Sequence, residues 1–164
     1  MSSSDRRTFL TLLACAPLTA CGFAPAYGPQ GAAGALQTRV RMSDPTDKAS
    51  FDLVERLEAR LGRPDAAVYD LTYVITTKAI GVGITTDGST TRYNLTGIVD
   101  WTLTERATAT RLTGGTVNSF TSYSATGSTV AGLAAEEDAG LRLMRILADQ
   151  IVTRLIAASA GWAK

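Results

Sequence analysis

The sequence predicts an α+β fold, a two-layer sandwich in which two helices cover one face of a four-stranded, mainly antiparallel sheet. Two long segments on either side of residues 87–88 alternate apolar and polar residues, as strands with one buried face do. Two other segments place apolar residues three and four positions apart, which is typical of amphipathic helices. The predicted order is strand, helix, three strands, helix, within a single domain at residues 36–164.

The two central strands give the clearest pattern. In residues 68–76 and again in residues 93–104, apolar residues take the odd positions and polar residues take most of the even ones. Asp87-Gly88 between the two segments is a strong turn signal. We therefore expect an antiparallel hairpin whose odd-numbered face, including Trp101, is buried.

The first strand and the first helix precede this hairpin. Residues 36–42 place apolar side chains at even positions, which predicts a strand. The helix is expected to start near residues 44–46 and to stop at Gly62 and Pro64. Its expected apolar stripe consists of Phe51, Val54, Leu57 and Leu61.

The last strand and the last helix follow the hairpin. Residues 111–126 are rich in Thr, Ser, Val, Phe and Tyr, and Gly114-Gly115 predicts a bulge within this strand. The last helix is expected at residues 133–160, with Gly161 as its stop. Its expected apolar stripe consists of Gly140, Met144, Leu147, Ala148, Ile151 and Leu155.

Residues 6–21 predict a lipoprotein export signal. Arg6-Arg7 and an apolar run are followed by Leu18-Thr19-Ala20-Cys21, the pattern called a lipobox. A lipobox cysteine becomes the first residue of the processed chain and receives a diacylglycerol on sulfur and an acyl chain on nitrogen. We therefore expect a signal peptide at residues 1–20, a lipidated Cys21 that anchors the chain to a membrane, and a tether at residues 21–35, which are rich in Gly, Pro and Ala.

Other interpretations of the same segment are possible. A membrane-spanning helix needs roughly 20 apolar residues, whereas residues 8–20 are fewer and contain Pro17. Cys15 also follows a lipobox-like sequence, but processing there would leave a very short apolar region. Residues 5–10 resemble a twin-arginine export signal, so both this route and the general secretory route stay open. Gly22 after the cysteine is compatible with the outer membrane of a Gram-negative cell.

Composition argues against several classes of function. The sequence contains no histidine, so Ser-His, Cys-His and His-metal chemistry are unavailable. Cys15 would leave with the signal peptide and Cys21 would be acylated. Removal of residues 1–20 would also take Asp5, Arg6 and Arg7 from the 15 acidic and 16 basic residues, leaving no net charge. We therefore expect that the protein is not an enzyme, and that it has no metal, no cofactor and no nucleic-acid partner.

Three stretches resemble the LptE family of lipopolysaccharide-assembly lipoproteins. They are CGFAPAYG at residues 21–28, RYNL at residues 92–95 and ADQIVTRL at residues 148–155. The resemblance implies a two-helix, four-stranded protein of the outer membrane, facing the periplasm. It implies a plug in the lumen of the large β-barrel LptD, which assists assembly of that barrel and helps to deliver lipopolysaccharide to the cell surface.

A lipopolysaccharide contact would need basic residues near an exposed turn, because this lipid carries phosphates. Lys78 and Arg92 flank the end of the predicted hairpin and are the candidates. The alternative is that both are ordinary solvated charges at strand ends. In better-known relatives, basic residues lie beside the turn and near the start of the last helix, where this chain has Thr86 and Ala135.

The side chains on the predicted exposed strand faces are small, neutral and rich in hydroxyls, which would suit a plug in a polar barrel lumen. The alternative is that threonine is there simply because it favours strands. The residues concerned are Thr72, Thr76, Thr96, Thr102, Thr104, Thr116 and Ser119. The alternative function is a transport-auxiliary or lipid-binding lipoprotein without a barrel partner. That function would need a concave apolar pocket, whereas a plug needs a filled core.

Overall fold

The computed structural model describes residues 31, 33–86, 88–125, 128–159 and 161–162. The predicted signal peptide, Cys21 and most of the predicted tether lie outside these residues, as does Asp87 of the predicted turn. Among the helices in the described part of the chain, none is both long and apolar enough to cross a membrane.

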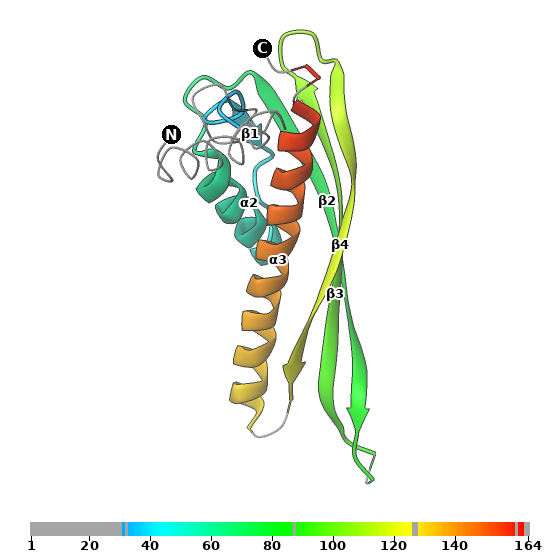
Figure 1. Ribbon diagram of the computed structural model, residues 1–164. Helices are drawn as coiled ribbons and strands as arrows, with labels where there is room; N and C mark the ends of the chain where they lie inside the picture. Colours follow the sequence, from blue (N-terminus) through cyan, green and yellow to red (C-terminus); the bar gives the residue numbers. More distant parts are fainter. Residues whose placement is uncertain (1–30, 32, 87, 126–127, 160, 163–164) are drawn as a thin grey trace, which may run out of the picture.

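The described residues form a four-stranded sheet with two helices on one face (Figure 1). The elements are β1 (Val40–Met42), α2 (Lys48–Leu61), β2 (Tyr69–Ile84), β3 (Thr90–Glu105), β4 (Arg111–Ser124) and α3 (Thr129–Ser159). The strands lie in chain order; β1 runs parallel to β2, and the other pairs are antiparallel. The predicted α+β sandwich and its element order are confirmed.

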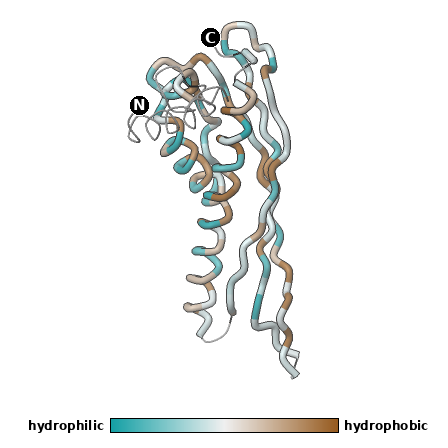
Figure 2. Tube along the Cα trace, in the orientation of Figure 1, coloured by the Kyte–Doolittle hydropathy of each residue, from teal (hydrophilic) through white to brown (hydrophobic). Residues whose placement is uncertain are grey.

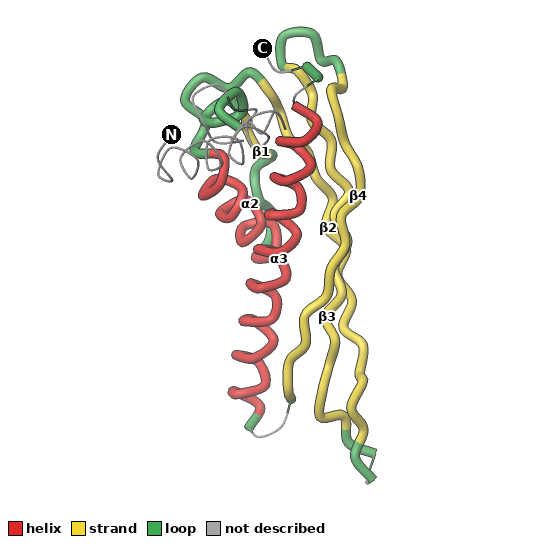
Figure 3. Tube along the Cα trace, viewed as in Figure 1, coloured by secondary structure: helices red, strands yellow, loops and turns green. Residues whose placement is uncertain are grey.

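The molecule is elongated, and its helices cover the sheet unevenly. Figure 3 shows β1 and α2 together at one end, while the hairpin of β2 and β3 extends past the start of α3 at the other end. The length of β2 and β3, 16 residues each, produces this extension. Only α3 accompanies the sheet towards the hairpin end (Figure 1).

The core lies between α3 and the odd-numbered face of the sheet, as the alternation predicted. The fully buried strand residues include Leu71, Val99 and Leu103, and Trp101 is 3% exposed. From α3, the fully buried side chains include Leu143, Leu147, Ile151 and Leu155. Gly97 lets α3 approach closely, because a Cβ at this position would come within 3.0 Å of both Leu143 and Leu147.

The N-terminus of α2 is fixed by a capping box. Ser50 donates from its backbone N–H and its hydroxyl to Asp47 Oδ1, at 2.7 and 2.6 Å, and the backbone N–H of Asp47 donates to Ser50 Oγ. The helix ends before Gly62, whose φ of 79° an L residue rarely adopts. The predicted stop at Gly62 is therefore confirmed.

Replacement of Asp47 by alanine is expected to lower the free energy of unfolding by about 1 kcal/mol at neutral pH. The hydroxyl and backbone N–H of Ser50 hold the pKa of the Asp47 carboxyl below its usual value of 3.8. A carboxyl whose pKa is lowered by folding stabilises the fold above its unfolded pKa, and this contribution is lost as the pH falls through the folded value. In urea unfolding at pH 7 and pH 3, the cost of Asp47→Ala should therefore be smaller at pH 3. Asp47→Asn, an uncharged cap, should show little of this pH dependence; an equal cost of Asp47→Ala at both pH values would contradict the account.

One expected member of the α2 stripe is on the wrong face. Phe51 is 56% exposed, whereas Val54, Leu57 and Leu61 are buried as predicted. At about 100° per residue, Phe51 lies roughly 120° around the helix from Leu57, outside the face that packs on the core. Leu53, which lies close to the centre of that face, is fully buried instead.

A bidentate ion pair joins the two helices. Arg56 donates from Nε and Nη2 to the two carboxylate oxygens of Asp149 on α3, at 3.1 and 2.8 Å. Arg60, one turn further along α2, lies 3.8 Å from the same carboxylate. The hydrogen bonds and the charge of Asp149 raise the pKa of Arg56 above its usual value. This pair links α2 to α3 in addition to the apolar packing between the two helices.

The structure also corrects two element boundaries and one buried position. The first strand is only Val40–Met42, because residues 33–39 form turns that include a positive φ of 57° at Thr38. The last helix begins at Thr129, four residues before the predicted start, and Ala139 rather than Gly140 is fully buried.

The irregularity in β4 lies near Leu112 and not at the predicted Gly114-Gly115. Thr113 pairs with Leu103 while Arg111 pairs with Thr104, so the register shifts between these pairs. Gly114 instead allows close backbone approach, because a Cβ there would lie 2.8 Å from the carbonyl oxygen of Trp101.

Candidate functional site

The even-numbered side chains of β2, β3 and β4 form the surface opposite the helices, which we call the open face. The strand register arranges these residues in rows that cross the sheet. Read from β2 to β4, the rows are Thr72–Thr102–Gly114, Val74–Asp100–Thr116, Thr76–Ile98–Asn118, Lys78–Thr96–Phe120 and Ile80–Asn94–Ser122. The open face is thus a long surface that presents hydroxyl, amide, apolar and a few charged groups.

Several hydroxyls on the open face bond to the sheet itself. Thr96 donates to the carbonyl oxygen of Lys78 at 2.9 Å, and Ser122 donates to Asn94 Oδ1 at 2.6 Å. Thr116 donates to the carboxylate of Asp100. These bonds hold the side chains in defined positions, and the remaining lone pairs of the hydroxyl oxygens can still accept bonds from a partner.

Ser119 does not belong to this surface, contrary to the prediction. It pairs with Gly97, whose missing Cβ would point at Leu143 and Leu147 on α3. Ser119 therefore shares the helix-covered side of the sheet. The other six predicted residues are at even positions of the strands.

The two candidate lipopolysaccharide contacts lie on the open face but do not form a cluster. Lys78 is paired with Thr96, and Arg92 is paired with Gly83 on one side and Ser124 on the other. Arg92 precedes Thr96 by four residues on β3, so the two rows are about 14 Å apart along the strand. Both residues are exposed, and neither side chain makes an ion pair with another described residue.

Exposed apolar side chains also lie on the open face, and these were not predicted as part of the site. Val74 on β2 is 65% exposed, Ile98 on β3 is partly exposed, and Phe120 on β4 is 61% exposed. They occupy successive rows on successive strands and so form a diagonal across the sheet. The sequence could have revealed them, because even positions in these strands belong to the face that the helices do not cover.

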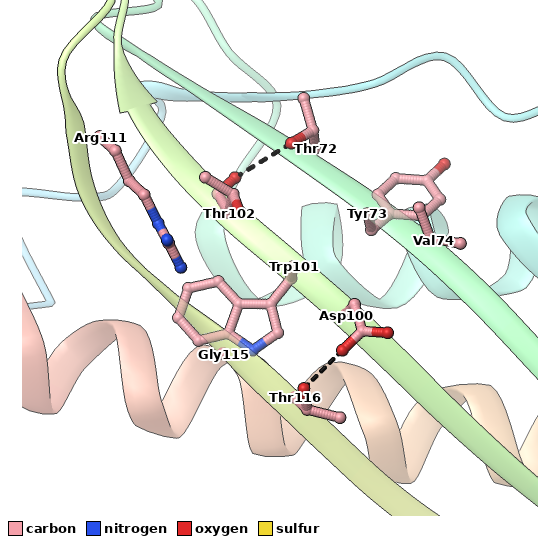
Figure 4. Close-up of a pocket in the computed structure, with 9 residues that line it drawn as sticks. All are labelled: Thr72, Tyr73, Val74, Asp100, Trp101, Thr102, Arg111, Gly115 and Thr116. Atoms are coloured by element: carbon pink, nitrogen blue, oxygen red, sulfur yellow. Dashed lines mark hydrogen bonds between the residues drawn. The ribbon is translucent and has the colours of Figure 1, made fainter.

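A shallow hollow of about 290 Å³ lies at the end of the open face near the start of β4 (Figure 4). Asp100 and Thr116 line it, and Arg111 contributes a third basic side chain that sequence analysis did not single out. The guanidinium of Arg111 lies over Gly114, where a Cβ would come within 2.7 Å of Nη2. Gly114 thus makes room for this cation.

Apolar residues continue towards the hairpin end of the molecule. Figure 2 shows hydrophobic stretches along β2 towards the hairpin end. Val82 and Ile84 on β2, and Val130 and Leu133 at the start of α3, are exposed.

No group of three or more Asp, Glu, His or Cys residues within the described ranges is placed to hold a metal ion. What the open face offers is hydrogen bonding, apolar contact and separated cations. A sheet with one helix-covered face and one long open face of this chemistry offers a surface on which a partner could bind.

The chain belongs to the LptE family, which is described as lipopolysaccharide-assembly and whose model matches residues 37–155. This match extends from just before β1 into the C-terminal part of α3 and confirms the family resemblance. No curated protein matches the chain.

Solved structures share the fold. The chain is similar to a lipoprotein from Caulobacter crescentus, with 20% identity, a TM-score of 0.70, and coverage of 82% of this chain and 99% of the other. It is also similar to rare lipoprotein B from Shewanella oneidensis, with 14% identity, a TM-score of 0.58 and coverage of 74% and 95%. A minor lipoprotein from Acinetobacter baumannii shows 19% identity, a TM-score of 0.54 and coverage of 73% and 89%. At these identities the likeness establishes the fold.

Proposed function

We propose that this protein is an outer-membrane lipoprotein, anchored through acyl chains on Cys21, that partners an LptD-type β-barrel. In this proposal its domain faces the periplasm, lies in the barrel lumen as a plug, assists assembly of the barrel and helps to deliver lipopolysaccharide to the cell surface. The observation that carries the proposal is the family match over residues 37–155, because it covers nearly all of the described sheet and both helices.

The physical character of the open face supports a plug. A barrel lumen is lined by polar groups, so a plug needs a surface that can exchange many hydrogen bonds with it. Thr72 donates its hydroxyl to the carbonyl oxygen of Thr102, and Thr116 donates its hydroxyl to the carboxylate of Asp100, so both hydroxyl oxygens are held in position and can accept bonds from a partner. The diagonal of Val74, Ile98 and Phe120 adds apolar area that a partner could bury.

The packing of the core favours a scaffolding role over a lipid-binding role. A lipid-binding lipoprotein without a barrel would need a deep apolar pocket between sheet and helices. In the described residues the centre of this space is filled by buried side chains, among them Leu71, Trp101 and Leu147, and a hollow of about 230 Å³ lies only at its edge, beside Thr77.

The proposal includes direct contact between this protein and lipopolysaccharide. Lys78 and Arg92 are exposed cations without a competing carboxylate among the described residues, so each could bind a phosphate through charge-assisted hydrogen bonds. Because their rows are about 14 Å apart along the strand, they would hold two separate phosphate groups, not one between them.

Depletion of the protein in its own cell tests the proposed function. We expect the amount of correctly assembled LptD to fall, with wrongly paired disulfides in the remaining barrel, and sensitivity to large hydrophobic antibiotics to rise. Re-expression of the wild-type chain should restore both properties. Normal assembly of the barrel during depletion would contradict the proposal.

A further inference from the structure

In the described part of the chain, one edge of the sheet is open over most of its length. β1 pairs only with Tyr69–Leu71 of β2, and the backbone N–H of Ser43 makes the next bond, to the carbonyl oxygen of Leu71 at 2.9 Å. The chain then leaves the sheet to start α2 at Lys48. Within the described residues, β2 from Thr72 onward has a strand partner only on its β3 side.

Along the open edge, the outward backbone groups have no backbone partner among the residues that the structure describes. Backbone N–H and C=O groups point alternately to the two sides of a strand, and Leu71 points towards β1. Tyr73, Ile75, Thr77 and Ala79 therefore point outward from this edge. Up to the irregularity at Gly81 and Gly83, the edge is about 30 Å long, at about 3.4 Å per residue.

This edge has little of the protection that proteins normally give to exposed strands. Natural sheets shorten their edges, charge them or interrupt them with bulges, because an open edge recruits another strand. Here Lys78 is the one charged residue between Asp70 and Asp87, and the register shift comes only at Gly81 and Gly83. Between the part that pairs with β1 and this register shift, β2 is a regular strand.

A hollow of about 230 Å³ lies beside the same edge, between β2 and the helices. Thr77 contributes from the edge strand, Ala49 from α2, Leu95 from β3, and Met144 from α3. Charged side chains also line it, and two of them, Lys48 and Asp52, pair with each other; the others are Glu136 and Glu137. Gly140 of α3 also lines it, and a Cβ at Gly140 would meet no atom within 4 Å. A space of about 150 Å³ is enough to hold a benzene molecule, so this hollow can hold one apolar side chain.

We propose that the open edge of β2 receives an extended segment of the barrel partner as an added strand. The edge supplies main-chain hydrogen bonds and the hollow supplies side-chain selectivity, which is the general arrangement of strand-addition sites. This inference rests on the proposed function, since that function supplies the partner.

The chemistry of the segment follows from the positions of Thr77 and Lys78. These neighbours lie on opposite faces of β2, Thr77 beside the hollow and Lys78 on the open face. An added strand therefore places an apolar side chain beside Thr77, directed into the hollow, and an acidic side chain beside Lys78. The acidic residue would pair with a cation that has no ion-pair partner among the described residues.

Hydrogen exchange tests the added strand directly. The protein alone is compared with its complex with the barrel, at single-amide resolution. We expect exchange at the outward amides of Thr77 and Ala79 to slow at least tenfold in the complex. The amide of Lys78, which faces β3, should be slow in both states and serves as the internal control. Unchanged exchange at Thr77 and Ala79 in an intact complex overturns the inference but leaves the proposed function standing, whereas failure to obtain a complex overturns both.

Two pairs of variants test the edge and the hollow separately. Ala79→Pro removes an outward N–H, which an edge strand tolerates, and should reduce the recovered barrel at least tenfold, whereas Ala79→Val keeps the N–H and should not. Gly140→Leu fills the hollow and should also reduce recovery, whereas Gly140→Ala should retain the barrel and raise the melting temperature. Wild-type recovery with both Ala79→Pro and Gly140→Leu would overturn the inference. Protection of Thr77 and Ala79 in a dimer of the protein alone would overturn it too, because a second copy would then occupy the edge.

Discussion

Replacement of Trp101 by alanine is expected to lower the free energy of unfolding by about 3–5 kcal/mol, measured by urea unfolding. The indole is 3% exposed and belongs to the core cluster between the sheet and α3. Gly115 pairs with Trp101 on β4, and Figure 4 shows the ring lying across that strand. Removal of the ring would leave a cavity that the backbone of a central strand cannot easily close.

Val74→Ala is the matched control for this variant. Val74 follows Tyr73, the residue of β2 that pairs with Trp101, but its side chain lies on the open face and is 65% exposed. Its truncation should therefore cost less than about 1 kcal/mol. A cost below about 1 kcal/mol for Trp101→Ala would mean that the buried face of the sheet is inverted. Trp101→Phe should cost less than Trp101→Ala, because it keeps a ring and removes a buried Nε1–H with no partner among the described residues.

Replacement of Cys21 by alanine is expected to move the protein almost completely from the membrane fraction to the soluble fraction. The proposed acyl chains would each contribute about 0.8 kcal/mol per buried methylene, and none could be attached to alanine. The domain should keep its melting temperature, because its described core lies entirely at or after residue 33. Fractionation followed by thermal unfolding measures both properties.

Cys15→Ala is the control for the anchor, because Cys15 follows the second lipobox-like sequence. This variant should stay in the membrane fraction. Release of Cys15→Ala, or retention of Cys21→Ala in the membrane, would place the anchor elsewhere. An unfolded Cys21→Ala domain would contradict the expectation that the lipid has no part in the core.

Local pattern was sufficient to predict most of the fold. Alternation of apolar residues around Leu71 and Trp101 depends only on which side of a strand each side chain points to, and both residues are buried as expected. Phe51 was misplaced because a three-and-four spacing does not say which residue lies at the centre of the stripe. Leu36 is buried from a turn and not from a strand, a difference that alternation over a few residues does not detect.

The candidate site was less predictable because it depends on pairing between distant segments. The even numbering of Lys78 and Arg92 correctly places them on one face, but their separation depends on the register between β2 and β3. The position of Arg111 depends on the close approach at Gly114. The open edge exists because β1 stops after Met42, and the predicted strand of residues 36–42 gave no sign of how far it pairs along β2.

Affinity purification from detergent-solubilised outer membranes tests the central claim most directly, with the tag on the C-terminus of the otherwise unchanged chain. The account predicts that LptD is recovered with the tagged protein in a one-to-one ratio and is absent from a purification of the same tag on an unrelated outer-membrane lipoprotein. Recovery of the tagged protein from outer membranes that contain LptD, without any LptD attached, would contradict the account.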